Sequence, residues 1–358
     1  MRRLPARQRT KSGRLIRRTF ARRGPKPGIH PKLYTAENNR SKGYARSPVK
    51  RHVIPAPNHL CLLNHYDQTM EFIHLVRDEI FIKRRRGLVL DFTPIQSIST
   101  DSALLLVSEM DRWRRATFQR RLRAINVDKW HPSVRTTLRD LGFFELLRLP
   151  NWLVGGNAEA PDGSKILKFR AGTGYGGKLA REVRIALEQI AGPIQTANFL
   201  HDGITEAMLN ARHHAYPGDF RPEIPVIPEF WVTGAWHPAK RLLRIMVLDQ
   251  GVGIPESIRQ GTDPFHVKVM VWVAQKANLR NDADIIEGAM RTSRTSTGLA
   301  GRGHGFDNMA EFINNSADGR LRILSDRGEV VYEHGGTINT RLLPVSLGGT
   351  LIEWEVRL

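Results

Sequence analysis

Two polar residues four positions apart, Glu206 and Asn210, have side chains that suit a magnesium–nucleotide site. Apolar residues recur at helical spacing from Phe199 to Tyr216, which predicts an amphipathic helix, and His214 continues its polar face. A carboxamide oxygen is a ligand that Mg²⁺ accepts beside waters and phosphate oxygens, and a carboxylate can polarise an attacking water or hydroxyl. The alternative is a solvated helix face that carries an ordinary polar pair.

A second candidate lies where an apolar run ends. Leu242–Leu248 predicts a buried strand, and Asp249 follows it directly. Gly251 and Gly253 then form a tight turn whose backbone can approach a flat ligand closely. A carboxylate in this position can accept a hydrogen bond from an exocyclic amine such as that of adenine. The alternative is an Asx turn without a ligand.

The glycine-rich stretch Thr297–Phe306 precedes another amphipathic segment. Free backbone N–H groups at such a helix start form an anion site, and Arg302 adds a charged contact for phosphates. A flexible glycine linker is the alternative, although the helix that follows argues against it. The last segment, Thr350–Leu358, alternates apolar and polar residues, which predicts a half-buried closing strand.

In this order, the motifs resemble the GHKL superfamily of ATP-binding domains, found in DNA gyrase, MutL, heat-shock chaperones, histidine kinases and bacterial anti-sigma serine kinases. The resemblance implies an α/β fold, a two-layer sandwich of the GHKL (Bergerat) type, over residues 166–358 that binds ATP with Mg²⁺. It implies a general base at Glu206, a Mg²⁺ ligand at Asn210 and an adenine-reading carboxylate at Asp249. It also implies ATP contacts at His214, Gly251, Gly253, Gly301, Arg302, Gly303, His304, Gly305 and Thr350.

The resemblance places a mobile lid at Pro255–Ala300, with a helix-like stretch over Phe265–Ala274. One departure is His304, where the family usually has an apolar residue. Residues Asn210–Pro217 are similar to the anti-sigma serine kinase pattern, with one extra residue. We therefore expect ATP hydrolysis or transfer of the γ-phosphate to a protein serine or threonine. The alternative is a non-catalytic, nucleotide-gated switch whose basic tail binds nucleic acid.

Residues 53–155 alternate short apolar strands with helices, which resembles a STAS domain, the fold of the anti-anti-sigma factors that serine kinases phosphorylate. The predicted elements are strands near Leu60–Leu63, Leu88–Phe92 and Leu122–Val127 and helices over Gln68–Lys83, Asp101–Trp113 and Pro132–Leu141. An alignment with one inserted residue places the family's phosphoacceptor at Ser102, whereas an ungapped alignment places Asp101 there. The simpler interpretation is that Ser99, Thr100 and Asp101 are N-cap candidates. A docking or dimerisation unit is a third reading of this domain.

Positive charge is concentrated at the start of the chain. Residues 1–51 contain 17 lysines and arginines and one acid, Glu37, so they carry +16 of the total net charge of +20. Proline and glycine are frequent and apolar periodicity is absent, which predicts a disordered tail over residues 1–52. Such a tail is typical of salt-sensitive nucleic acid binding. The alternatives are a solvated tail, or one that meets an acidic protein or lipid surface.

Several classes are disfavoured by the sequence. No apolar run approaches the ~18 residues that a membrane span requires, so we expect no membrane partner. The single cysteine, Cys61, excludes an internal disulfide, which fits a cytoplasmic protein. None of the 13 histidines has a metal-ligand spacing. Glycine and proline cluster at the predicted linker, residues 156–165. A protein partner and a homodimer both remain open.

Overall fold

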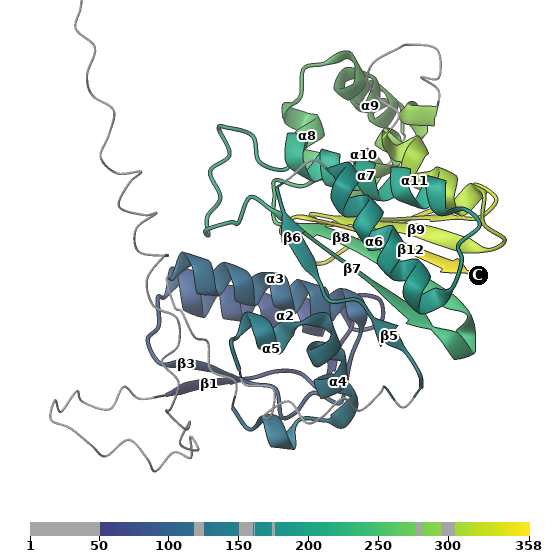
Figure 1. Cartoon of the computed structure of the whole chain (residues 1–358). Helices are drawn as coiled ribbons and strands as arrows, with labels where there is room; N and C mark the ends of the chain where they lie inside the picture. The colour runs from purple at the N-terminus through teal and green to yellow at the C-terminus, as the bar shows by residue number, and fades with distance from the viewer. Residues whose placement is uncertain are drawn as a thin grey trace, which may run out of the picture. The chain divides into compact units, whose positions relative to one another are not determined.

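The computed structural model describes residues 51–117, 125–149, 160, 162–173, 176–276, 281–294 and 305–358. These residues belong to one unit, Val49–Leu358 (Figure 1). The unit is a mixed α/β structure built on an eight-stranded sheet. The predicted tail at residues 1–52 lies almost entirely outside the described residues.

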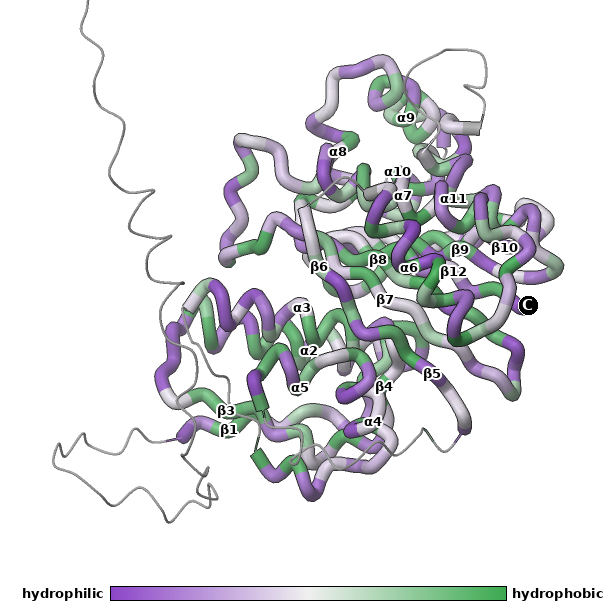
Figure 2. Tube along the Cα trace, in the orientation of Figure 1, coloured by the Kyte–Doolittle hydropathy of each residue, from purple (hydrophilic) through white to green (hydrophobic). Residues whose placement is uncertain are grey.

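The sheet is antiparallel throughout, with the order β11-β10-β9-β12-β8-β7-β5 and with β6 also paired to β7. Its strands are β5 (Lys165–Ile166), β6 (Arg170–Gly172), β7 (Phe230–His237), β8 (Leu242–Asp249), β9 (Gly319–Ser325), β10 (Gly328–Glu333), β11 (Ile338–Leu342) and β12 (Thr350–Arg357). The predicted strand Leu242–Leu248 is therefore confirmed as β8. It is covered on both faces, and Figure 2 accordingly shows it mostly in hydrophobic colour.

One face of the sheet is covered by four helices: α6 (Gly176–Ala191), α7 (Ala197–His214), α10 (Asp282–Arg294) and α11 (Gly305–Asn314). Their apolar sides pack on alternate strand residues such as Val232, Ile245 and Trp354 in one buried core. Two further helices, α8 (Ile254–Gln260) and α9 (Pro264–Gln275), follow β8 and contact α10. The predicted helix Phe199–Tyr216 is confirmed as α7, and the stretch Phe265–Ala274 lies within α9.

The opposite face of the sheet is covered by the N-terminal layer, residues 52–149. It contains β1 (His52–Pro55), β2 (His59–Leu60), α2 (Tyr66–Arg77), a π-helical turn (Asp78–Ile82), β3 (Leu88–Asp91), β4 (Ser97–Ile98), α3 (Thr100–Ala116), a 3-10 turn (Val127–Lys129), α4 (Pro132–Leu141) and α5 (Phe143–Leu146). Its core is continuous with Trp231, Met246, Leu248 and Leu351 of the large sheet.

The N-terminal layer departs from the predicted elements in two places. Its strands form two separate parallel pairs, β1 with β3 and β2 with β4. The predicted strand Leu122–Val127 is not formed where it is described, because Val127 begins a 3-10 turn; residues 122–124 lie outside the described part. The STAS-like assignment therefore remains a prediction.

The last strand also differs from its prediction. We expected Thr350–Leu358 to be half-buried, but β12 lies centrally between β8 and β9 and is buried on both faces through most of its length. Its polar residues meet cationic partners on neighbouring strands: Glu353 pairs with Arg322, and Glu355 with Arg244. Because the N-terminal layer covers this face, alternation of polar and apolar residues here does not mean exposure.

Among the described residues, none of the helices combines the length and apolar character that a membrane crossing requires.

Candidate nucleotide site

Helix α7 provides one wall of a cavity of about 810 Å³. Glu206, Asn210 and His214 all line it, as expected from their spacing along one helix face. The other side of the helix is buried, with Ile204 and Met208 packed against the sheet. The prediction that these three polar residues share one surface is thus confirmed by the fold.

The carboxyl end of β8 pairs with Thr350 of the cavity lining, but Asp249 itself is not among the lining residues. Asp249 is the last residue of β8, and its side chain is almost fully buried, with 7% of the residue exposed. Its Oδ1 accepts a hydrogen bond from the backbone N–H of Gly251 at 2.8 Å. Burial raises the pKa of this carboxyl to about 7, although the hydrogen bonds from the Gly251 and Thr350 backbone oppose the rise.

Thr350 faces Asp249 across the β12–β8 ladder and lines the cavity. Its hydroxyl lies 2.8 Å from that of Ser325, whose oxygen also accepts the backbone N–H of Ile254 at 2.7 Å. This pair therefore connects the start of β12 to the turn that follows β8. Ser325, at the end of β9, carries no sequence signal that would have marked it.

Two glycines in the turn after β8 are required by close packing. A Cβ at Gly251 would lie 2.3 Å from the carbonyl oxygen of Ala215, which lines the cavity. Gly253 has φ +83, and a Cβ there would lie 2.3 Å from a carboxylate oxygen of Asp326. The turn can thus approach both α7 and β9 only without side chains at these positions.

Helix α9 supplies the wall opposite α7, within the segment predicted to be a lid. Asp263 caps this helix by accepting the N–H groups of Phe265 and His266, both at 3.0 Å. His266 Nδ1 lies 3.1 Å from the other oxygen of Asp263, and its ring meets that of His214 edge-on at 6.3 Å between centroids. Sequence reasoning missed these two lining residues. The signal available was Asp-Pro at a helix start.

The loop predicted to bind phosphate is described only at its last residue, Gly305. Gly301, Arg302, Gly303 and His304 lie outside the described residues. Gly305 begins α11 and lines the cavity. A Cβ at Gly305 would lie 2.6 Å from Glu206 Oε1, so this carboxylate packs directly against the backbone at the start of α11.

The oxygen donors in the cavity fit a magnesium ion that arrives with a nucleotide. Among the described residues, no three His, Cys, Asp or Glu side chains gather as metal ligands would. The lining does include the Asn210 carboxamide and the Glu206 carboxylate. Mg²⁺ commonly takes one or two protein oxygens and completes its shell with waters and substrate phosphates, so this donor set is sufficient.

Comparison with known protein families agrees with this geometry. Residues 195–351 match the family described as histidine kinase-, DNA gyrase B-, and HSP90-like ATPase. The chain contains a GHKL-type ATPase domain. The match spans α7, the turn after β8, α11 and the start of β12, and a domain of this type supports ATP binding. No curated protein matches the chain in a sequence comparison.

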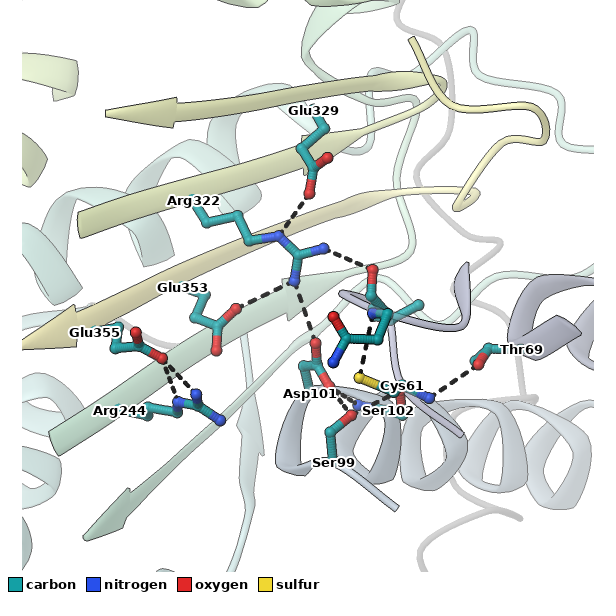
Figure 3. Close-up of polar contacts among 12 residues, drawn as sticks. Cys61, Thr69, Ser99, Asp101, Ser102, Arg244, Arg322, Glu329, Glu353 and Glu355 are labelled. Atoms are coloured by element: carbon teal, nitrogen blue, oxygen red, sulfur yellow. Dashed lines mark hydrogen bonds and ion pairs between the residues drawn. The ribbon is translucent and has the colours of Figure 1, made fainter. Parts of the chain in front are cut away.

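The predicted phosphoacceptor, Ser102, lies away from the cavity of the ATPase domain. It belongs to α3, which packs on the sheet face opposite α7, and only 2% of it is exposed. Its hydroxyl lies 3.1 Å from that of Ser99 (Figure 3). Ser102 and Glu206 are therefore separated by the sheet, and the hydroxyl is covered in this arrangement.

The N-cap prediction for α3 is confirmed in position only. Ser99 stands at the N-cap with an extended backbone, but its hydroxyl oxygen accepts no helix N–H group, and its one hydrogen has the Leu60 carbonyl at 3.2 Å and the Asp101 carboxylate as acceptors. Asp101 pairs with the buried Arg322 of β9 at 3.3 Å. The start of α3 is thus tied to the sheet, as Figure 3 shows.

Proposed function

We propose that this protein is a Mg²⁺-dependent, ATP-binding regulator that hydrolyses ATP or transfers its γ-phosphate to a protein serine or threonine. The observation that carries this proposal is the convergence of Glu206 and Asn210 with Gly305 and Thr350 around one cavity of about 810 Å³. That volume lies within the range of small-molecule sites, roughly 300–1,000 Å³. The residues come from three elements that are far apart in sequence, α7, α11 and β12.

The two ends of the cavity differ in chemistry, which orients the nucleotide. At one end, Thr350 lines the cavity, and Asp249, its partner in the β12–β8 ladder, would accept the exocyclic amine of adenine. At the other, the start of α11 at Gly305 presents backbone N–H groups to the phosphates. Glu206 packs against Gly305, so its carboxylate lies at the phosphate end, where a general base is needed.

Glu206 would therefore polarise either a water or an incoming hydroxyl for attack on the γ-phosphate. Mg²⁺ would be held by Asn210 together with phosphate oxygens and waters, and would neutralise charge on the phosphates. His266 and Phe265 on α9 would exclude water from the opposite side.

The decisive experiment follows the γ-phosphate of labelled ATP with Mg²⁺ and the wild-type protein. Free labelled phosphate identifies an ATPase, and label on a protein serine or threonine identifies a kinase. Mapping the labelled residue also tests Ser102, whose hydroxyl must first be uncovered. Binding of ATP without either product would contradict the catalytic proposal and favour a nucleotide-gated switch.

A substitution at Gly305 tests the placement of the base. An alanine Cβ would displace the Glu206 carboxylate, so Gly305→Ala should lower turnover by about 10- to 100-fold, because small misplacements of a catalytic group are costly. The control is Gly177→Ala in α6, where a Cβ would meet nothing within 4 Å. Rates of phosphate release and melting temperatures of both variants would be compared with wild type. Wild-type turnover in Gly305→Ala would contradict the placement.

The second candidate function is a nucleotide-gated switch that binds nucleic acid, and it is favoured by the distribution of charge. Besides the 17 basic residues among positions 1–51, the exposed turn Lys83–Arg86 presents four consecutive cations between the π-helical turn and β3. Glu79 pairs with two of them, Lys83 and Arg85.

This candidate predicts strong salt dependence. Affinity for a labelled DNA or RNA oligonucleotide should fall by about 100-fold or more between 50 and 200 mM salt, because binding by phosphate neutralisation releases counterions. Fluorescence anisotropy with the full chain and with a chain that begins at Arg51 would measure it. Equal affinity of the two forms, or affinity independent of salt, would contradict binding through the basic residues.

A further inference from the structure

Helix α2 of the N-terminal layer holds three consecutive carbonyls of the loop that leads into β12. The hydrogen bonds run from Tyr66 Oη to Val345 at 3.0 Å, from His74 Nε2 to Ser346 at 2.8 Å and from Arg77 Nη2 to Leu347 at 3.0 Å. Two glycines with positive φ, Gly348 and Gly349, then connect this loop to Thr350. The start of β12 is therefore fixed from the far side of the sheet.

Helix α3 holds the strand that faces Thr350, through Gln250, the residue after Asp249. The Gln250 amide donates to the Ser108 carbonyl at 3.0 Å and accepts from Arg112 Nε at 3.0 Å. Gln250 is 3% exposed and Arg112 is 2% exposed. The peptide that carries the Asp249 side chain is thus anchored to a buried polar group of the N-terminal layer.

The polar contacts between the layers are connected to one another. Arg77 and Arg112 both pair with Glu109 of α3, at 2.9 Å and 3.1 Å. The backbone N–H of Gln250 donates to the Tyr216 hydroxyl at 3.0 Å, just beyond the end of α7. Buried networks of this kind fix one arrangement, because moving any member leaves a polar group without its partner.

We propose that the N-terminal layer is a positioning element for the adenine end of the nucleotide site. It holds the residue after Asp249 and the loop before Thr350, two residues that face each other across the β12–β8 ladder. This inference rests on the proposed function, in which the pair recognises adenine. Docking of α2 and α3 is then thermodynamically linked to nucleotide affinity. By reciprocity, ATP favours the docked layer, and a partner that draws α2 and α3 away weakens ATP binding.

The test uses full-length variants that remove these contacts without touching the cavity. Gln250→Met preserves side-chain length but removes the amide, and the double variant Tyr66→Phe, His74→Ala removes two bonds to the loop before β12. Each should weaken ATP binding by about 5- to 10-fold, the effect of losing one or two hydrogen bonds. Gln250→Glu keeps the acceptor for Arg112 and should recover part of the affinity.

The control is Arg115→Gln, also on α3, which removes ion pairs to Glu229 at 2.7 Å and to Asp111 at 2.9 Å; neither partner is Gln250 or one of residues 345–350. This substitution should leave ATP affinity within about twofold of wild type, since the loss of the Arg115 ion pairs weakens the interface away from Gln250 and the loop before β12. Calorimetry with ATP and GTP measures the preference for ATP over GTP, which a general loosening of the interface would not change. Mispositioning of the adenine end should reduce the preference for ATP over GTP, whereas general loosening should weaken both equally.

Hydrogen exchange supplies the reciprocal measurement: ATP should slow exchange of α2 and α3 amides in wild type and less so in Gln250→Met. Unchanged ATP affinity and unchanged selectivity in both contact variants would overturn the positioning role alone. Failure of wild type to bind ATP would instead contradict the proposed function, so the two failures are distinguishable.

Discussion

Replacing Glu206 by glutamine should reduce turnover of the γ-phosphate by about 10²- to 10⁴-fold, the usual contribution of a general base. The amide has the same shape but cannot accept the proton of a water or hydroxyl. The side chain lines the cavity and packs against Gly305, so its loss should affect chemistry rather than adenine binding. ATP affinity should therefore stay within about threefold of wild type, because the variant retains the contacts that bind ATP equally in the ground state and the transition state.

Single-turnover release of labelled phosphate and calorimetric ATP binding would separate the two effects. Glu188→Gln is the matched control, because Glu188 lies on α6 and pairs with Arg184 on the surface. A Glu206→Gln protein with the wild-type rate would exclude Glu206 as the base and direct attention to His266 across the cavity.

Replacing Asp249 by asparagine should weaken ATP binding by about 10- to 100-fold, because a hydrogen bond to a charged group is lost. The side chain is buried at the end of β8, so water cannot substitute readily for it. Affinity for ATP and GTP measured by calorimetry would show whether the loss falls on the adenine. An Asp249→Asn protein that binds ATP as wild type does would contradict adenine recognition by this residue.

The same carboxyl predicts a pH dependence with a definite sign. Burial raises its pKa to about 7, and only the ionised form accepts the adenine amine fully. ATP affinity should therefore rise as the pH rises through 7, by about tenfold from pH 6 to pH 8, and level off above that. The nucleotide phosphates titrate in the same range, so the Asp249→Asn profile serves as the reference for their contribution.

Asp326 provides the matched control for this pH profile. Burial raises its pKa to about 7 as well, with the negative charge of Asp282 contributing, and it packs against Gly253 directly after β9 and does not pair with the lining residue Thr350 as Asp249 does. The Asp326→Asn protein should keep the rise in affinity with pH, displaced slightly to lower pH because a neighbouring negative charge is gone. If Asp326→Asn abolishes the rise and Asp249→Asn retains it, the assignment to Asp249 is wrong.

Much of the ATPase domain could be predicted from local periodicity. The helical repeat around Glu206, Asn210 and His214 placed all three on one face, because residues four apart on a helix are neighbours in any fold. The apolar run before Asp249 and the glycines after it likewise defined a strand and a turn. These patterns are local, so tertiary packing had only to bring them together: the cavity is lined by Glu206, Asn210 and His214 and by Gly253 of the turn, with Asp249 paired to the lining residue Thr350.

Other features depend on contacts between distant segments. In the sequence, Gln250 has the position of an ordinary turn residue. Its hydrogen bonds to Ser108 and Arg112 exist only because the fold places α3 against it. Ser325 gains its role only because β9 lies beside β12.

By itself, the sequence determined which side chains have the chemistry of a nucleotide site and on which helix, strand or loop they lie. It could do so because side-chain type and short-range spacing are properties of the sequence itself. Only the tertiary structure decided what covers the second face of the sheet. That covering layer buries Glu353 and Ser102, which a pattern of polar and apolar residues cannot distinguish from solvent-facing ones. The physical reason is that burial of a polar side chain depends on a partner, and partners such as Arg322 come from elements remote in sequence.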